Sequence, residues 1–181
     1  MSVPDPLRSL LDAAREGDDR ALAELVRRSQ PSVWRLCAAL GSPTDAADLV
    51  QETYLRAIPA LAHYRGDAPV LPWLLAIARR VCADHVRRQQ RQRRLIDRLG
   101  SFAARDNAAG DNGGGASDAG LRELLASLTP DRREAFVLTQ ELGMSYEEAA
   151  LVVGCPVGTI RSRVSRARSD LLQAVRQADI A

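Results

Sequence analysis

The sequence predicts an all-α protein with two small helical domains joined by a flexible linker, the C-terminal one a helix-turn-helix. Apolar residues recur at helical spacing in both halves, and no alternating strand pattern competes with them. Between the halves, residues 100–120 are rich in Gly, Ala, Asn and Asp and have no apolar periodicity, which is typical of a linker. We therefore divide the chain into residues 1–98, a linker at 99–120, and residues 121–181.

Three helices are expected in the first 60 residues. The first starts at Asp5 and ends at Gly17. In the second, Pro31 has no amide hydrogen to donate and is expected to break or kink the helix. The third opens at Pro43. Its inward-facing side chains would be Leu49, Val50, Thr53, Tyr54, Ala57 and Ile58.

A loop at residues 63–70 precedes a long helix that runs from about residue 71 to the mid-90s. Pro72 suits the first turn of this helix. The helix is apolar early and basic late, since residues 79–98 hold eight arginines against two acids. Such a helix can pack at one end and contact phosphate at the other. The arginines that share one of its faces are Arg80, Arg87, Arg91, Arg94 and Arg98.

In the C-terminal half, residues 121–128 predict a short amphipathic helix, and Thr129 would cap the next one, with Pro130 in its first turn. Gly143 would end that helix. A capping box of Ser145 and Glu148 then opens a third.

The last helix follows a tight turn at Gly154, so residues 145–170 form a helix-turn-helix. Its apolar stripe is Ile160, Val164, Ala167, Leu171 and Val175. Serines lie opposite this stripe and arginines flank them, a combination that suits close approach to a DNA groove. The alternative is an ordinary solvated basic face, but turn chemistry, serines and arginines coincide here, so we favour DNA contact.

Composition limits the remaining possibilities. All 25 basic residues are arginine, and the three cysteines form no CxxC or His/Cys cluster, so neither a metal nor a cofactor is expected. With two histidines and no carboxylates clustered at metal-binding spacing, a nuclease or other enzyme is not expected either. No apolar run approaches 18 residues, which predicts a soluble, cytoplasmic protein.

Three segments, taken in order, resemble the extracytoplasmic-function (ECF) group of bacterial sigma factors. They are DAADLVQETYLRAI (45–58), PWLLAIARRVCADHVRR (72–88) and MSYEEAALVVGCPVGTIRSRVSRARSDL (144–171). The resemblance covers both halves and implies a subunit that binds core RNA polymerase and directs promoter-specific initiation. It would recognise the −35 element as duplex and the −10 element as melted DNA.

The resemblance also implies a role for particular residues. Those that would bind the polymerase clamp are Asp48, Leu49, Gln51, Glu52 and Arg56. Those that would bind −10 DNA are Tyr64, Arg65, Gly66, Asp67, Arg79, Arg80, Arg87 and Arg88. Those that would bind −35 DNA are Thr159, Arg161, Ser162, Arg163, Ser165 and Arg166.

The partners implied are core RNA polymerase, through its clamp and flap regions, and promoter DNA. The flap would be contacted near Arg132, Arg133, Phe136 and Leu138. Family members are usually held inactive by an anti-sigma factor, which makes such a protein a candidate partner. The alternative function is a dimeric helix-turn-helix repressor or activator that binds a palindromic duplex without polymerase.

Overall fold

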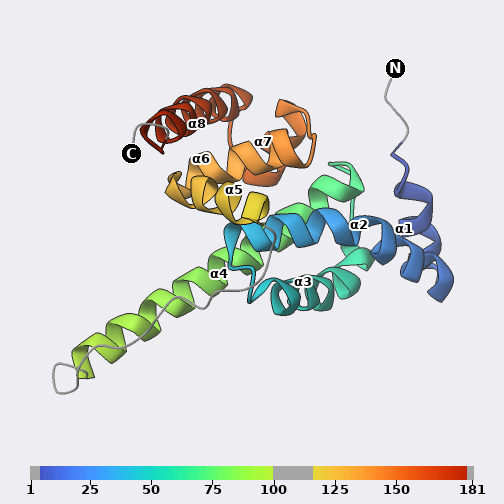
Figure 1. The fold of residues 1–181 in the computed structure, drawn as a ribbon. Helices are drawn as coiled ribbons and strands as arrows, with labels where there is room; N and C mark the ends of the chain where they lie inside the picture. Colours follow the sequence, from blue (N-terminus) through green and yellow to red (C-terminus); the bar gives the residue numbers. More distant parts are fainter. Residues whose placement is uncertain (1–4, 100–115, 179–181) are drawn as a thin grey trace.

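Helices are the only regular elements in the part of the chain that the computed structural model describes, residues 5–99 and 116–178. The first range holds α1 (Arg8–Arg15), α2 (Asp19–Leu40), α3 (Ala46–Ala60), the 3-10 turn η1 (Leu61–His63) and α4 (Val70–Leu99). The second holds α5 (Ala116–Ser127), α6 (Pro130–Phe136), the π-helical turn η3 (Val137–Glu141), α7 (Tyr146–Val153) and α8 (Val157–Ala178). Figure 1 shows α4 as the longest element, with the late half extending away from the other helices. The expected all-α class is confirmed.

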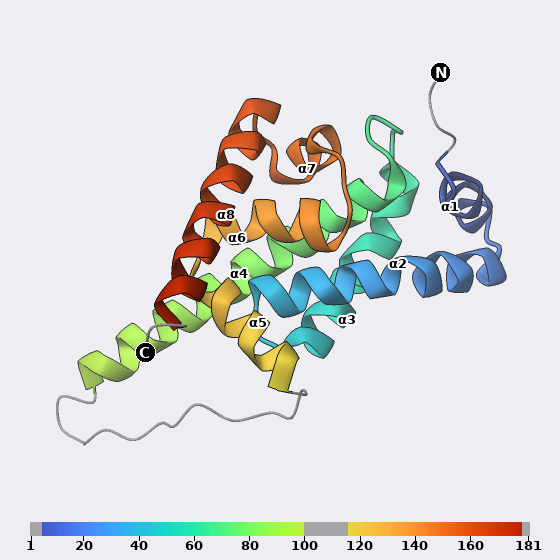
Figure 2. The same cartoon turned by 45° about the horizontal axis from the view of Figure 1, so that its top comes forward.

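One hydrophobic core is continuous between the two halves. The early half of α4 packs against α2 and α3 on one side and against α7 on another, while α6 contacts α2 (Figure 2). The first half of the chain contributes Val33, Leu36, Cys37, Ala46, Leu49, Val50, Leu75, Ala78, Val81 and Cys82. The second half contributes Ala135, Val137, Leu138, Met144, Ala149, Ala150, Val152, Ile160 and Val164. Because apolar burial is the main driving force of folding, this shared core holds the two halves together.

A smaller core joins α1 to the start of α4. Its buried members are Leu7, Leu11, Leu25, Ala57, Leu61, Tyr64, Val70 and Leu74. This core therefore also includes the loop between η1 and α4, which was expected to meet DNA.

Pro31 does not break the second helix. α2 runs from Asp19 to Leu40 with Pro31 inside it. Its buried residues on both sides of the proline, Leu25 before it and Val33 after it, belong to the two cores. Packing over the whole length of α2 outweighs the hydrogen bond that proline removes.

The third helix starts three residues later than expected, at Ala46 rather than Pro43. The carboxylate of Asp45 makes no capping bond and instead accepts a hydrogen bond from Gln89 and lies 3.1 Å from His85 Nε2. At the other end of α3, Ile58 was expected to face inward but is exposed, and it lines a hollow together with side chains of α2 and α4.

One boundary and two side chains of the C-terminal half also differ from expectation. Residues 100–115 of the expected linker lie outside the described residues, but 116–120 are helical and form the start of α5. Thr129 precedes α6 without donating or accepting a side-chain cap; its carbonyl accepts from the amides of Arg132 and Arg133 instead. In α8 the buried stripe ends before Val175, which is exposed.

Truncation of a core side chain between the two halves should be costly. Leu75 is fully buried in the shared core, so Leu75→Ala is expected to lower the free energy of unfolding by about 2–5 kcal/mol. The exposed Leu151 on α7 is the matched control, and Leu151→Ala should change it by at most about 0.5 kcal/mol. Urea unfolding followed by circular dichroism measures both, and equal effects would contradict the shared core.

Glu134 should make stability depend on pH. Its carboxylate is buried and accepts a hydrogen bond from Arg79, yet burial raises its pKa above the ordinary glutamate range. A raised pKa in the folded state contributes stability that is present at low pH and is lost as pH rises through that pKa. Glutamine cannot titrate, so the melting temperature of Glu134→Gln relative to wild type should rise between about pH 5 and about pH 8.

The exposed Glu147 on α7 offers a control for that experiment. Glu147→Gln should shift the melting temperature little at either pH, since its side chain stays in water. If the melting temperature of Glu134→Gln relative to wild type falls with rising pH, the pKa of Glu134 is lowered and not raised in the folded state.

Candidate DNA and polymerase interfaces

The helix-turn-helix is fixed by its own local hydrogen bonds. Glu148 N–H donates to Ser145 Oγ at 3.1 Å, and Ser145 N–H donates to Glu148 Oε2 at 2.9 Å, which completes the predicted capping box. Gly154 ends α7 in the left-handed conformation, with φ at +75°, and its amide donates to Ala150 O. A residue with a Cβ is strained there, so glycine sets the angle between α7 and α8.

α8 presents a polar face to solvent. Ile160, Val164 and Ala167 are buried against the rest of the domain, which turns the opposite side of the helix outward. Thr159 is half-buried, and the exposed residues on that side are Arg161, Ser162, Ser165 and Arg166. Of the acids that the structure describes, none pairs with Arg161 or Arg166. Their guanidinium groups are therefore available to phosphate or to base edges.

Arg163 differs from its neighbours because it is held within the domain. Its Nη2 donates to Asp131 at the start of α6, and the side chain is only 23% exposed. Arg132 on α6 pairs in the same way with Asp170 on α8. These two ion pairs fix α8 against α6, so Arg163 does not belong to the free basic face.

The loop before α4 is partly buried. Tyr64 is only 7% exposed: its ring meets Trp73 edge-on with the ring centres 5.2 Å apart, and its hydroxyl donates to Ala68 O at 2.5 Å. Arg65, Gly66 and Asp67 are exposed, and Gly66 has φ at +83°. In this conformation Tyr64 packs in the smaller core beneath the loop, and Arg65, Gly66 and Asp67 form the solvent-exposed part of the loop.

The arginines of α4 fall into two groups. Arg79 is bound to Glu134 of the C-terminal half, and Arg87 is bound to Asp84, whose pKa it lowers. Arg80 and Arg88 are exposed and pair with no acid among the described side chains. The same holds farther along the helix for Arg91, Arg93 and Arg94, of which Arg93 was absent from the predicted basic face.

The outer face of α3 carries most of the residues predicted to bind polymerase. Asp48 and Gln51 are exposed, and Glu52 is half-buried and pairs with Arg56. Leu49 is buried in the shared core and cannot reach a partner. Leu55 was missed by the sequence reasoning, although it is 62% exposed and lies four residues after Gln51 on the same face.

Residues predicted to contact the flap have structural partners. Leu138 is fully buried. Arg133 donates to the carbonyls of Ala126 and Leu128 and so ties α6 to the end of α5. Phe136 packs in a small cluster with Leu128 and is half-buried.

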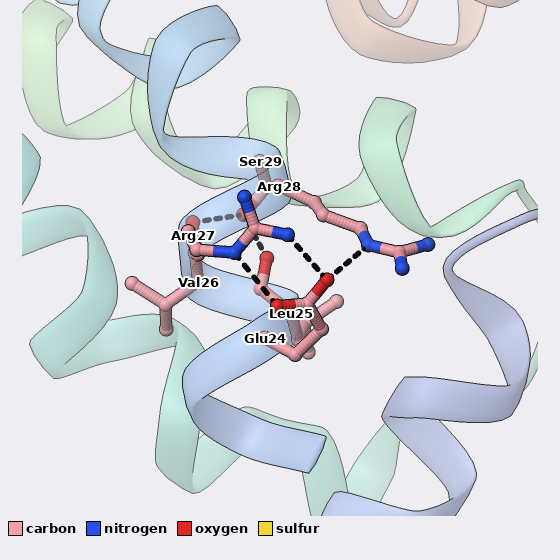
Figure 3. Close-up of polar contacts among 6 residues, drawn as sticks. All are labelled: Glu24, Leu25, Val26, Arg27, Arg28 and Ser29. Atoms are coloured by element: carbon pink, nitrogen blue, oxygen red, sulfur yellow. Dashed lines mark hydrogen bonds and ion pairs between the residues drawn. The ribbon is translucent and has the colours of Figure 1, made fainter. Parts of the chain in front are cut away.

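Several arginines outside the expected DNA surfaces are neutralised by acids. Glu24 on α2 accepts from both Arg27 and Arg28, while Ser29 bonds to carbonyls of its own helix (Figure 3). These bonds lower the pKa of Glu24 to about 2. Arg56 is likewise shared between Glu52 and Asp84. Late α4 and α8 keep exposed arginines without a described acid partner, and so do two positions of α2, Arg20 and Arg35.

Metal chemistry has no candidate site in the described ranges, where no three His, Cys, Asp or Glu side chains come together. All three cysteines are free; Cys37 and Cys82 are buried in the shared core. Within the same ranges, no helix is long and apolar enough to cross a membrane.

Both halves of the chain match known families. Residues 25–92 match the model of sigma-70 region 2, and residues 119–171 match that of sigma-70 region 4. The ECF RNA polymerase sigma factor SigC of Mycobacterium tuberculosis is 44% identical to this chain, over 94% of the chain and 92% of the relative. The ECF sigma factor EcfG of Rhodopseudomonas palustris is 36% identical, over 83% of each protein.

Solved structures agree with these relatives. CnrH, in complex with the cytosolic domain of CnrY, superposes with a TM-score of 0.71 at 30% identity, covering 95% of this chain and 97% of CnrH. The sigma factor RpoE of Bartonella quintana, in complex with the anti-sigma factor NepR, gives 0.69 at 29% identity, covering 86% and 96%.

A repressor built only around a helix-turn-helix would not account for the region 2 half. The order of the two matched regions, the all-helical fold and the similarity over nearly the whole chain account for both halves. The chain belongs to the ECF family of RNA polymerase sigma factors, which bind core polymerase and direct promoter-specific transcription initiation.

Proposed function

We propose that this sigma factor grips its promoter at two places, with α8 in the −35 duplex and the 64–67 loop with α4 on the melted −10 strand. The observation that carries the proposal is the outer face of α8, where arginines without described acid partners flank small serines. It acts in the cytoplasm, where polymerase and chromosome meet, and it is not an enzyme.

At the −35 element, Arg161 and Arg166 would contact bases or phosphates, and Ser162 and Ser165 would let the helix approach closely. Thr159 lies near the start of α8, the end that enters the groove first in this motif. Arg163 has a different part, because its bond to Asp131 sets the angle at which α8 is presented.

At the −10 element, the exposed Arg65, Gly66 and Asp67 would hold an unstacked base of the non-template strand. Gly66 allows the left-handed backbone of the loop, and a cation and a carboxylate acceptor beside it supply the hydrogen bonds that this needs. Arg80 and Arg88 would then bind the backbone of the strand, with Arg87 beside them. Strand opening would be driven by capture of flipped bases and needs no ATP.

The outer face of α3 would bind the polymerase clamp. Its acids and Gln51 give charge complementarity, while Leu55 gives the apolar contact that a stable interface requires. Leu49 would act from the core by holding α3 in place.

Arg79 suggests how the protein is controlled. Its pairing with Glu134 occupies a predicted −10 contact and holds the C-terminal half on α4. Promoter binding at two points would require this contact to open. The groove between the halves, lined by Leu40, Val86 and Pro130 among others, would accept a helix of an anti-sigma factor, the kind of partner that accompanies RpoE in its solved complex.

Removal of the free α8 arginines should weaken −35 recognition. Arg161→Ala combined with Arg166→Ala is expected to lower transcription from a −35-dependent promoter at least about tenfold, since each bidentate base contact contributes about 1–3 kcal/mol. Run-off transcription with core polymerase measures this, and Arg176→Ala, an exposed arginine near the end of α8, is the control. Equal activity of the double variant and the control would contradict the proposed −35 site.

A negative charge in place of the exposed Leu55 on the outer face of α3 should weaken polymerase binding. Leu55→Asp is expected to raise the Kd for core polymerase about tenfold or more. Burial of this exposed leucine in the interface with polymerase would contribute about 1.5–3 kcal/mol, which the variant loses. Leu172→Asp places the same charge at an equally exposed leucine of α8 and should leave the Kd unchanged. Fluorescence anisotropy of labelled sigma factor distinguishes the two, and an unchanged Kd for Leu55→Asp would exclude this face.

A further inference from the structure

α1 and the residues before it are fastened to the loop that precedes α4. The Oδ2 atom of Asp5 accepts a hydrogen bond from the amide of Val70, the first residue of α4, at 2.7 Å. The Oδ1 atom of the same carboxylate accepts from the amide of Leu7 at 3.0 Å. Asp5 thus caps α4 from 65 positions away in sequence and fixes where the loop ends.

Arg8 covers the middle of the loop. Its guanidinium lies 5.2 Å from the centre of the Tyr64 ring, at a distance typical of a cation–π contact, and is held there by Asp12 at 2.9 Å. A Cβ at Gly66 would come within 2.6 Å of Arg8 Nη1, so the guanidinium lies directly against the loop backbone. Figure 2 shows α1 beside the loop that leads into α4.

The loop is therefore held by three contacts. Tyr64 packs in the smaller core, Arg8 lies against the backbone at Gly66, and Asp5 accepts a hydrogen bond from the amide of Val70, where the loop joins α4. The exposed residues between these points are those proposed to take the −10 base. The match to sigma-70 region 2 begins at residue 25, so α1 lies outside the matched segment. Its role in this chain has to be inferred from these contacts.

We propose that Asp5 and Arg8 are positioning residues for −10 recognition, which shape the 64–67 loop for one base and hold it ready before DNA arrives. The inference rests on the proposed role of the loop. A loop held in one conformation binds with a smaller loss of conformational entropy, so loosening it should reduce base discrimination more than polymerase binding.

The experiment compares discrimination at the −10 element between variants. A duplex promoter selected from a randomised library with core polymerase is tested against the same promoter with one −10 base changed, and the ratio of abortive product is recorded. Asp5→Ala is expected to lower this ratio about fivefold, the effect of losing one capping interaction. Arg8→Ala removes the cation–π contact with Tyr64 and is expected to lower it about two- to fivefold. Asp5→Asn keeps one acceptor oxygen and should fall between wild type and Asp5→Ala.

Three further measurements separate positioning from simple loss of structure. Binding to core polymerase and to −35 duplex should be unchanged, and 2-aminopurine fluorescence at the flipped −10 position should fall in the variants. Glu16→Ala and Arg20→Ala remove the same charges from exposed positions at the end of α1 and the start of α2, and should retain wild-type discrimination. Because the side chain of Arg8 is 44% exposed, Arg8→Ala keeps the test informative even if Asp5→Ala is unstable.

The outcomes are distinct. If Arg65→Ala combined with Asp67→Ala lowers discrimination but Asp5→Ala and Arg8→Ala do not, the positioning role of Asp5 and Arg8 is wrong. The proposed −10 role of the loop then stands. If the loop double variant also leaves discrimination unchanged, the proposed −10 role of the loop fails and the positioning role fails with it. A uniform loss on every template, with weaker polymerase binding, would mean that α1 is only structural.

Discussion

Burial of the apolar first half of α4 is the interaction on which the rest of the structure depends. Leu75, Ala78 and Val81 lie in one core that receives α2 and α3 from the N-terminal half and α7 from the C-terminal half. The same helix then continues past this core with its exposed arginines. α4 thereby forms part of the N-terminal core, provides the surface on which the C-terminal half packs, and extends its arginine-rich late half away from the other helices (Figure 1).

Acids hold some of the arginines in internal ion pairs and leave others available. With 25 arginines and no lysine, the chain cannot distinguish surfaces by residue type, and ion pairing is one feature by which its arginines differ. Glu24 and Glu52 pair with arginines away from the expected DNA surfaces, and Asp84 pairs with the predicted −10 contact Arg87, whereas Arg161 and Arg166 have no such acid among the described residues. An arginine without an internal acid partner can neutralise a DNA phosphate and so release the counterions condensed on the DNA.

Local rules predicted the fold well wherever structure arises from neighbouring residues. The capping box at Ser145, the left-handed Gly154 and the apolar stripe through Ile160 all involve positions a few residues apart. At Pro31 these rules allowed a break or a kink, and the break does not occur because packing along the whole of α2 keeps the helix continuous. They also missed Leu55, because exposure at an apolar position depends on which neighbouring helices cover it.

The sequence by itself determined the helices, the helix-turn-helix and the family, because periodicity, caps and motif order are written in consecutive residues. Only the tertiary structure decided which predicted site residues are free. Arg163 meets Asp131 across 32 positions, Arg79 meets Glu134 across 55, and Val70 donates to Asp5 across 65. Each contact joins residues from different helices or from a loop and a helix, and their distance in space follows from how apolar faces pack rather than from any pattern along the chain.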